Sequence, residues 1–280
     1  MNRVLMIAVL AVGLLGGSGA AAMTMQLGDQ PDGRPTFLYR FQRPYFAGDV
    51  DPELFTGYHE FQAQVPLSGR LGAVLSLPVA RVFDDELTDE DFLYPERVGK
   101  TILGNVYLGI HDQKSPGGLA VDAGAFLPTV GHAYGMAARL AMLSDPHHYQ
   151  RFFPDLLTLR VTLARAFVAR SGLYVRGELG PDVWLPVGDN TRNDVELIVR
   201  YGVGVGVSGA RWDGGVEFVG WAIATESEAT FSEASAHVLS AGVERKGDRV
   251  TPGVFASIPT DEAFAAVDWL LGVRLKVALD

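Results

Sequence analysis

Apolar side chains recur at every second residue along almost the whole chain after residue 35. In the stretch DVELIVRYGVGVGVS (194–208), every odd position from Val195 to Val207 is apolar, whereas the even positions carry mostly acid, base or glycine. A period of two is typical of β-strands with one oily face. We count about twelve such segments, at 36–46, 58–67, 70–81, 100–111, 118–128, 156–169, 172–185, 193–208, 214–225, 233–246, 249–259 and 267–279.

The lengths of these segments and of their connections indicate a membrane barrel. Most segments run for ten residues or more, whereas strands of soluble proteins average about 5 to 6 residues and tilted membrane-crossing strands need about 9 to 11. Tight turns such as SGR, RSG and KGD alternate with longer, mostly acidic links. The pattern predicts an all-β fold, an antiparallel transmembrane β-barrel of about 12 strands with short periplasmic turns and longer extracellular loops.

A secreted β-sandwich is the alternative fold, because its strands alternate in the same way. Three features favour the barrel over the sandwich: the strand length, the asymmetry of the loops, and the glycine and alanine on the non-apolar face. The sandwich also predicts a protein that is soluble without detergent after export.

The N-terminal residues have the layout of an export signal. Arg3 precedes an apolar run, and Ala20 and Ala22 fit the A-x-A cleavage pattern. We expect a signal peptide at 1–22 and the barrel at 23–280. An uncleaved anchor is less favoured because the apolar run is shorter than the ~20 residues that span a bilayer. The chain has no cysteine and a formal net charge of −10, which excludes disulfides and argues against a nucleic-acid partner.

If the apolar parity faces lipid, the polar parity faces the lumen. A charge on the lipid face near the midplane costs about 2 to 4 kcal/mol for Arg or Lys, so the assignment is strongly determined. Two segments are less regular, because Arg165 falls in the lipid parity and Glu217 shares the parity of Val219 and Trp221; a bulge or a position near the rim would explain each. The predicted pore-lining residues are Arg40, Glu60, Gln62, Gln64, Asn105, Asp122, Arg160, Arg176, Glu178, Glu196, Arg200, Arg249, Arg274 and Lys276.

Three further features bear on how open the lumen is. The stretch YGMAARLAML (134–143) predicts a short amphipathic helix in the longest loop, Thr129 to Pro154. This helix either folds into the barrel mouth as a constriction or caps the loop, and we favour the cap. Three inward glycines, Gly202, Gly204 and Gly206, either widen a passage or make room for a loop or an aromatic ring.

Aromatic residues near the strand ends fit the girdles that mark the two membrane interfaces. The alternative is that they are ordinary core aromatics, as a sandwich would require. The predicted girdle residues are Tyr45, Phe46, Phe92, Tyr94, Tyr149, Phe152, Phe153, Trp184, Trp212 and Trp269.

The sequence offers little catalytic or metal chemistry. His147 and His148 are adjacent and lie in a loop that we expect to be exposed, so we predict no metal site and no cofactor. Some outer-membrane barrels are phospholipases with Ser, His and Asn on the outer wall. Here His237 with Ser235 or Ser240 comes nearest to that set, but no helper Asn or Asp is evident, and we expect no enzyme.

The segment TILGNVYLGIHDQKSPGGLAVDAGAFLPT (101–129) resembles a hairpin of bacterial outer-membrane barrels of the phenol-degradation (MetA-like) and transporter group. In that hairpin a G-N-x-Y-L-G strand is followed by a turn and a strand that ends in Leu-Pro-Thr. The resemblance covers about a tenth of the chain and implies an outer-membrane channel for small organic molecules. The last strand is similar to the signal that outer-membrane assembly machinery reads, although it closes on Leu279 and Asp280 rather than Phe.

Together these features predict a channel of the bacterial outer membrane for the passive diffusion of small polar or amphipathic solutes. The alternative is a non-conducting barrel that serves as a scaffold or receptor through its extracellular loops, such as FDDELTDEDF (83–92). The expected partners are outer-membrane lipids, small-molecule solutes and the assembly machinery.

Overall fold

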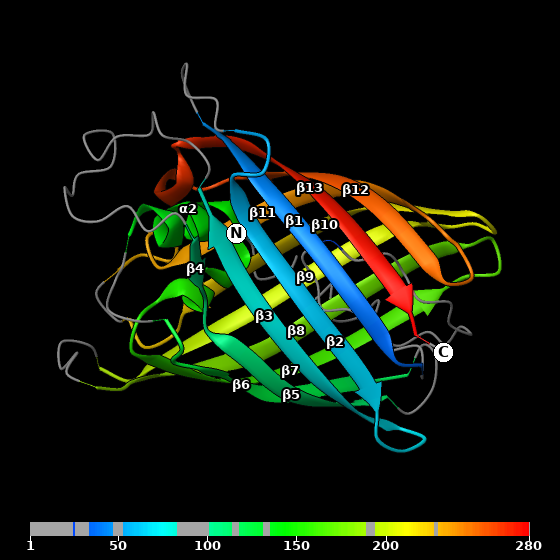
Figure 1. Ribbon diagram of the computed structural model, residues 1–280, viewed down its shortest axis with the longest axis horizontal. Helices are drawn as coiled ribbons and strands as arrows, with labels where there is room; N and C mark the ends of the chain where they lie inside the picture. Colours follow the sequence, from blue (N-terminus) through cyan, green and yellow to red (C-terminus); the bar gives the residue numbers. More distant parts are fainter. Residues whose placement is uncertain are drawn as a thin grey trace.

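The chain forms a closed antiparallel barrel (Figure 1). The computed structural model describes Met25 and residues 34–46, 53–82, 101–113, 118–130, 135–188, 194–226 and 229–279. The strands are β1 (Thr36–Phe46), β2 (Gly57–Pro66), β3 (Leu71–Arg81), β4 (Thr101–Leu103), β5 (Val106–Gln113), β6 (Ala120–Leu127), β7 (Leu156–Val168), β8 (Leu173–Pro186), β9 (Glu196–Ser208), β10 (Trp212–Ile223), β11 (Ser235–Arg245), β12 (Val250–Pro259) and β13 (Val267–Ala278).

The barrel closes because β1 pairs with β2 on one side and with β13 on the other. β4 is a short addition at the end of β3, so the other twelve strands form the ring. The predicted segment 100–111 is therefore broken: β4 ends at Leu103 and β5 begins at Val106, and only β5 continues the ring beside β3. The predicted barrel of about 12 strands is confirmed.

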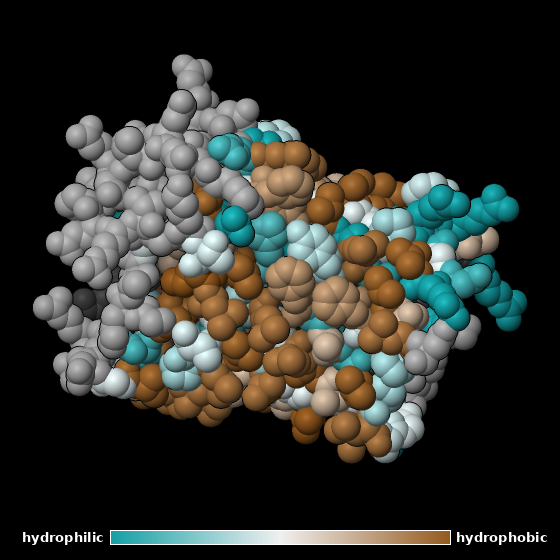
Figure 2. Space-filling model, viewed as in Figure 1, coloured by the Kyte–Doolittle hydropathy of each residue, from teal (hydrophilic) through white to brown (hydrophobic). Residues whose placement is uncertain are grey.

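The outer wall is apolar across its middle. In Figure 2 the side chains over the strands are mostly brown, and hydrophilic residues gather at the end that carries the short turns. Val205, Val254 and Leu271 are among the exposed large hydrophobic residues. A closed barrel leaves no unpaired strand edge in the hydrocarbon, and an apolar outer band is what lipid requires. These features place the chain in a bacterial outer membrane. None of its described helices is long and apolar enough to cross a membrane.

The two irregular segments have different explanations. Arg165 faces outward three residues before the end of β7, with its guanidinium over the ring of Phe167 at 4.6 Å, so its charge is able to reach the periplasmic interface. Glu217 faces the lumen together with Val219 and Trp221, and all three are buried. Because β10 pairs in regular register with both neighbours, a bulge at Glu217 is not the explanation.

Candidate functional site

The long loop between β6 and β7 folds into the barrel. It contains a helix, α2 (Met136–Ser144), and a 3₁₀ segment, η2 (Pro146–Phe152). The face of α2 that carries Ala137, Leu140 and Ala141 is buried and packs in one cluster with Tyr58 of β2 and Leu270 of β13. The predicted helix is confirmed, but our preference for an external cap is wrong. An alanine-rich face allows a helix to fit closely against the inner wall, and Pro146 prevents the helix from continuing.

Asn105 anchors this loop at the break between β4 and β5. Its side-chain amide donates to the carbonyl oxygens of Gln150 at 3.1 Å and Phe153 at 2.7 Å, and its side-chain oxygen accepts from the Val130 amide at 3.1 Å. The Asn105 backbone N–H also donates to the carbonyl of Arg151 at 2.6 Å. Asn105 is fully buried, so these bonds are made away from water and hold the loop in place.

The neighbours of Asn105 explain the rest of the G-N-x-Y-L-G and Leu-Pro-Thr pattern. A side chain at Gly104 would collide with the Arg151 carbonyl and the Phe152 ring. Thr129 accepts from the Val106 amide and donates to the Gly104 carbonyl, which joins the two ends of the hairpin at the break. Tyr107 fills the space above Gly109 and Gly124 on the lumen side. The motif builds the seat of the inserted loop.

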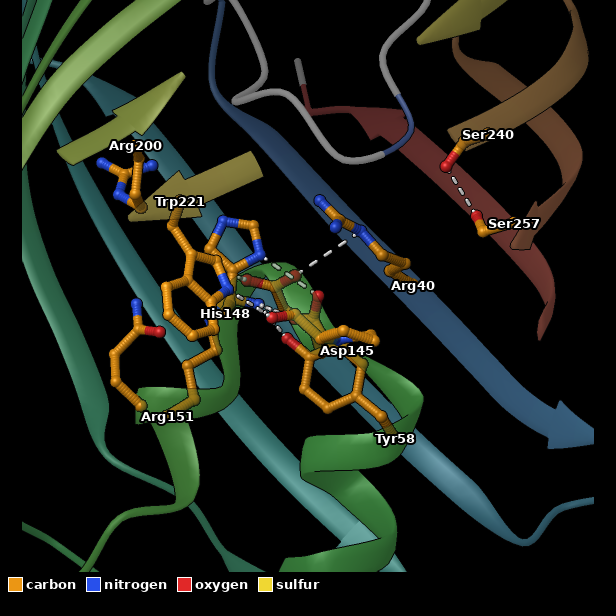
Figure 3. Close-up of polar contacts among 12 residues, drawn as sticks. Arg40, Tyr58, Asp145, His148, Arg151, Arg200, Trp221, Ser240 and Ser257 are labelled. Atoms are coloured by element: carbon orange, nitrogen blue, oxygen red, sulfur yellow. Dashed lines mark hydrogen bonds and ion pairs between the residues drawn. The ribbon is translucent and has the colours of Figure 1, made fainter. Parts of the chain in front are cut away.

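An ion cluster holds the other side of the loop. Arg151 pairs with Glu60 of β2 at 3.1 Å and with Asp145 at 3.1 Å, and it donates to the Tyr58 hydroxyl. In Figure 3 Asp145 and Tyr58 lie beside each other, and Arg40 from β1 reaches toward the same cluster. All of these side chains are buried. Charge-assisted hydrogen bonds of this kind are stronger than neutral ones, so the loop is held by both amide and ionic contacts.

A second cluster crosses β7, β8 and β9. Arg160 donates to both oxygens of Asp182, at 3.0 and 2.6 Å, and Arg200 donates to Asp182 at 3.0 Å and to Thr162 at 2.8 Å. Asp182 lies opposite Arg160 in the ladder, and the next strand brings Arg200 beside it. Gln150 of the loop also donates to Asp182 at 3.4 Å, which ties the loop to this wall.

Between the two clusters lies a cavity of about 100 Å³. Its lining residues come from β1–β3, β5–β9 and η2, and none of the described residues of β10–β13 contributes. Met25 covers part of the opposite wall: it is fully buried, packs against Phe255 and donates its N–H to Glu217 at 3.0 Å. The space between the loop and the wall thus lies along one side of the lumen.

Nine of the predicted pore-lining residues lie around this cavity: Arg40, Glu60, Gln62, Gln64, Asp122, Arg160, Arg176, Glu178 and Arg200. Asn105 holds the loop instead. Arg274 pairs with Glu244 on the opposite wall, and Lys276 is half-buried on the same strand. Arg249 is exposed in a periplasmic turn, and Glu196 lies at the extracellular start of β9.

Sequence reasoning missed several residues of the site. Asp182 was missed because it follows Pro181 near the end of a predicted strand. Arg151 and Asp145 were missed because they lie in a loop. Tyr58 and Ser76 are the other partners that were missed. Asp182 could have been predicted, because it occupies an even position in the same segment as Arg176 and Glu178, which were predicted to face the lumen.

Inward aromatics surround the loop, and this corrects part of the girdle prediction. The ring of Tyr149 lies 5.2 Å from Trp184 and 4.7 Å from Trp221, and the Trp221 indole donates to the Pro146 carbonyl at 2.9 Å. Trp184, Tyr149, Phe152, Phe153 and Phe46 were predicted as girdle residues, but they pack inside the barrel. Tyr149, Phe152 and Phe153 belong to the inserted loop itself, and Trp184 and Phe46 pack against the loop because it offers an apolar surface inside the barrel.

Three of the girdle predictions, Tyr45, Trp212 and Trp269, agree with the structure. Trp269 faces outward and stacks on Tyr45 with ring centroids 3.8 Å apart, and Trp212 is exposed at the periplasmic end. The predictions for Phe92 and Tyr94 lie outside the described residues, as does the acidic segment 83–92.

One of the inward glycines makes room for a ring. Tyr174 of β8 fills the space above Gly206 and Gly215, which leaves no room for a side chain at either position. At Gly206 the aromatic alternative therefore holds, rather than a wider passage.

The two loop histidines are buried, contrary to the prediction that they are exposed. His148 interacts with Asp145 at 3.2 Å. Burial lowers the pKa of His147 and of His148 well below the usual value for histidine, and the nearby arginines lower both further. Among the described residues, no group of three His, Cys, Asp or Glu side chains is arranged to hold a metal ion.

The outer wall carries a different histidine arrangement from the one considered in sequence. His237 Nδ1 lies 3.0 Å from Asp261, and its Nε2 lies 2.6 Å from the Tyr201 hydroxyl. Ser240 faces the lumen and bonds to Ser257, and Ser235 donates to the Phe231 carbonyl. In the described part of the chain, no serine side chain has a hydrogen bond to His237, so the phospholipase-type arrangement is not formed.

Comparisons with known proteins bear on the fold. No protein-family model matches the chain, and no curated protein matches it. The chain is similar in structure to the COG4313 outer membrane channel from Pseudomonas putida F1, with a TM-score of 0.57 and 9% identity over 91% of this chain and 100% of that one. LpxR from Salmonella typhimurium gives a TM-score of 0.48 and 8% identity over 87% and 100% of the two chains. At 9% identity the likeness to the COG4313 channel is one of fold, that of an outer-membrane β-barrel.

Proposed function

We propose that the protein is an outer-membrane channel through which small polar or amphipathic solutes diffuse passively. The observation that carries the proposal is the charged cavity between the inserted loop and one side of the barrel wall. The lining is rich in guanidinium and carboxylate groups, whereas apolar side chains would suffice to fill a lumen for stability alone. Such groups admit polar solutes and repel apolar ones.

The inserted loop then acts as the constriction of the channel. Its contacts with Asn105, Glu60 and Asp182 fix the width of the space beside it. The resemblance of the 101–129 hairpin to the phenol-degradation group favours small organic molecules as solutes. We further propose that residues 1–22 are removed on export and that the last strand engages the assembly machinery. No step of this function calls on a cofactor.

A non-conducting barrel is the second candidate, and a specific observation favours it. The loop is held on two sides by buried contacts, and Met25 covers part of the opposite wall. A lumen closed in this way would leave the extracellular loops as the working surface, as in a scaffold or receptor.

Single-channel recording in planar bilayers separates the two candidates. The chain is refolded in detergent, and folding is checked by its resistance to denaturation before heating. We expect discrete current steps from the folded protein. Folded protein that gives no current at any voltage, and no swelling of liposomes in small sugars or amino acids, would exclude the channel and favour the non-conducting barrel.

A further inference from the structure

The cavity wall carries more positive than negative groups. Five arginines line the cavity, namely Arg40, Arg151, Arg160, Arg176 and Arg200, against three carboxylates, Glu60, Asp122 and Glu178. The partner acids Asp145 and Asp182 do not line the cavity, although they pair with Arg151, Arg160 and Arg200. The lining itself therefore carries five guanidinium groups against three carboxylates, and an excess of this kind favours anions locally despite the acidic balance of the whole chain.

Arg40 is the most available of these cations. It is buried and 4% exposed, and its closest charged partner is Glu60, whose oxygen lies 3.6 Å from Nε. That separation is beyond hydrogen-bond length, and the Arg40 Nε and Nη1 atoms have no hydrogen-bond partner among the described residues.

Glu60 does not hydrogen-bond to Arg40, since its Oε2 atom lies 3.6 Å from Arg40 Nε and accepts no hydrogen bond from the described residues. Its Oε1 atom accepts from Ser76 at 2.7 Å and from Arg151 at 3.1 Å. Two buried guanidinium groups therefore share one carboxylate at the edge of the cavity. Buried donors without partners are uncommon in native proteins and call for a water or an ion that completes them.

The remaining lining groups suit a small organic acid. Gln62, Gln64 and Thr162 offer neutral hydrogen bonds, and Val74 and Ala164 offer a short apolar surface. The lining acid Asp122 already accepts the hydroxyl of Tyr107, which reduces its pull on cations. A space of about 100 Å³ has room for several waters or for a small carboxylate.

From this geometry we infer that the cavity is an anion-selective site that takes small organic carboxylates, with the Arg40 guanidinium as the group that binds the carboxylate. A planar guanidinium fork matches a carboxylate with two parallel hydrogen bonds. The inference rests on the proposed function, because it names the class of solute that the channel passes.

The test uses the absence of cysteine from the chain. A single Gln62→Cys variant places a thiol at the cavity, and Ser171→Cys places one at an exposed periplasmic turn. Each is treated with a methanethiosulfonate that carries a sulfonate and with one that carries a trimethylammonium group. We expect the ratio of anionic to cationic reaction rates to be about fivefold higher or more at position 62 than at position 171.

Substitutions at Arg40 then assign the effect to this residue. In the Gln62→Cys background, Arg40→Gln should lower the rate ratio by about threefold or more, and Arg40→Lys should restore it because the charge is kept. Arg170→Gln removes an exposed charge from a periplasmic turn and should leave the ratio unchanged. At equal ionic strength, sodium acetate should slow the reaction of the sulfonate reagent more than sodium chloride does. This difference between the two salts should be larger in the Gln62→Cys variant that keeps Arg40 than in the Gln62→Cys variant that also carries Arg40→Lys.

The outcomes separate this inference from the proposed function. Equal ratios at positions 62 and 171, or a thiol at 62 that reacts with neither reagent, would overturn the anion site whatever the protein conducts. A conducting protein whose reversal potential in a KCl gradient favours potassium would overturn it as well. A higher anionic ratio at 62 in a protein without current would keep the anion site and exclude the channel.

Discussion

The outer and inner walls of the barrel are built from the same strands under different rules. Val205 and Val254 on the outer wall are 48% and 50% exposed, and each is suited to lipid by its own apolar side chain. Asp182 on the inner wall is suited to its place only because Arg160 and Arg200 meet it there from neighbouring strands. On the outer wall each residue suits its environment by its own side chain, whereas on the inner wall a charged residue is stable only together with its partners.

The largest expected effect comes from breaking one inner group. Asp182→Ala leaves the buried Arg160 without its carboxylate and the buried Arg200 with only Glu178 at 3.7 Å, and an uncompensated buried charge costs about 3–5 kcal/mol. Urea unfolding in lipid vesicles, followed by tryptophan fluorescence, measures the loss in the free energy of unfolding. Asp248→Ala, in an exposed turn, is the matched control and should change little. Equal losses in the two variants would contradict the grouping of the inner wall.

A charge on the outer wall should cost less, and its cost should depend on depth alone. Val254 lies in the middle of β12 and faces outward, so Val254→Arg should lower the free energy of unfolding by about 2–4 kcal/mol. Val250→Arg places the same charge on the same face at the periplasmic end of β12 and should cost about 0–1 kcal/mol. The same unfolding assay compares them, and a larger cost at Val250 would reverse the predicted depth dependence.

Asn105 lies where the inner wall meets the loop, and its loss should act locally. Asn105→Ala removes the donor to the Gln150 and Phe153 carbonyls and leaves buried groups unpaired, which costs about 1–3 kcal/mol. We expect faster amide hydrogen exchange within 136–152 and a larger single-channel conductance, while exchange in the strands is unchanged. Gln62→Ala, which also removes an inward amide, is the control for the exchange measurement. Exchange that stays slow in the loop of Asn105→Ala would show that the ion cluster alone holds it.

The two walls also differ in how far the sequence predicts them. The bounds of most strands and the lipid-facing parity followed from period-two alternation, because contact with lipid depends on one residue at a time. The inner groups did not follow: Arg160 and Arg200 were predicted to face inward, but Asp182 and the loop residue Arg151 were missed, since their roles depend on register and on the path of the loop. The girdle prediction failed in part for the same reason. The alternation places Trp269 on the outer wall, but it carries no information about the inserted loop against which Trp184 packs inside the barrel.

The smallest expected effect is on pH and concerns His148 in η2. Burial lowers the pKa of His148 well below its usual value, and Arg151, Arg160, Arg200 and Arg40 lower it further. A histidine in a released loop regains a pKa near 6.5, so the released state binds more protons as the pH falls below that value. The inserted state therefore keeps its full stability above about pH 6.5 and loses part of it as the pH falls from there toward the depressed pKa.

We accordingly expect amide exchange within 136–152 to be faster at pH 5 than at pH 7.5 once the intrinsic pH dependence of exchange is removed. His148→Gln should weaken this dependence, because glutamine does not titrate. His237→Gln, on the outer wall beside Asp261, is the control and should leave the dependence of the loop in place. A loop whose corrected exchange is the same at both pH values would mean that His148 stays neutral in both states, and that the ion groups of the inner wall, rather than a titrating side chain, decide how often the loop is released.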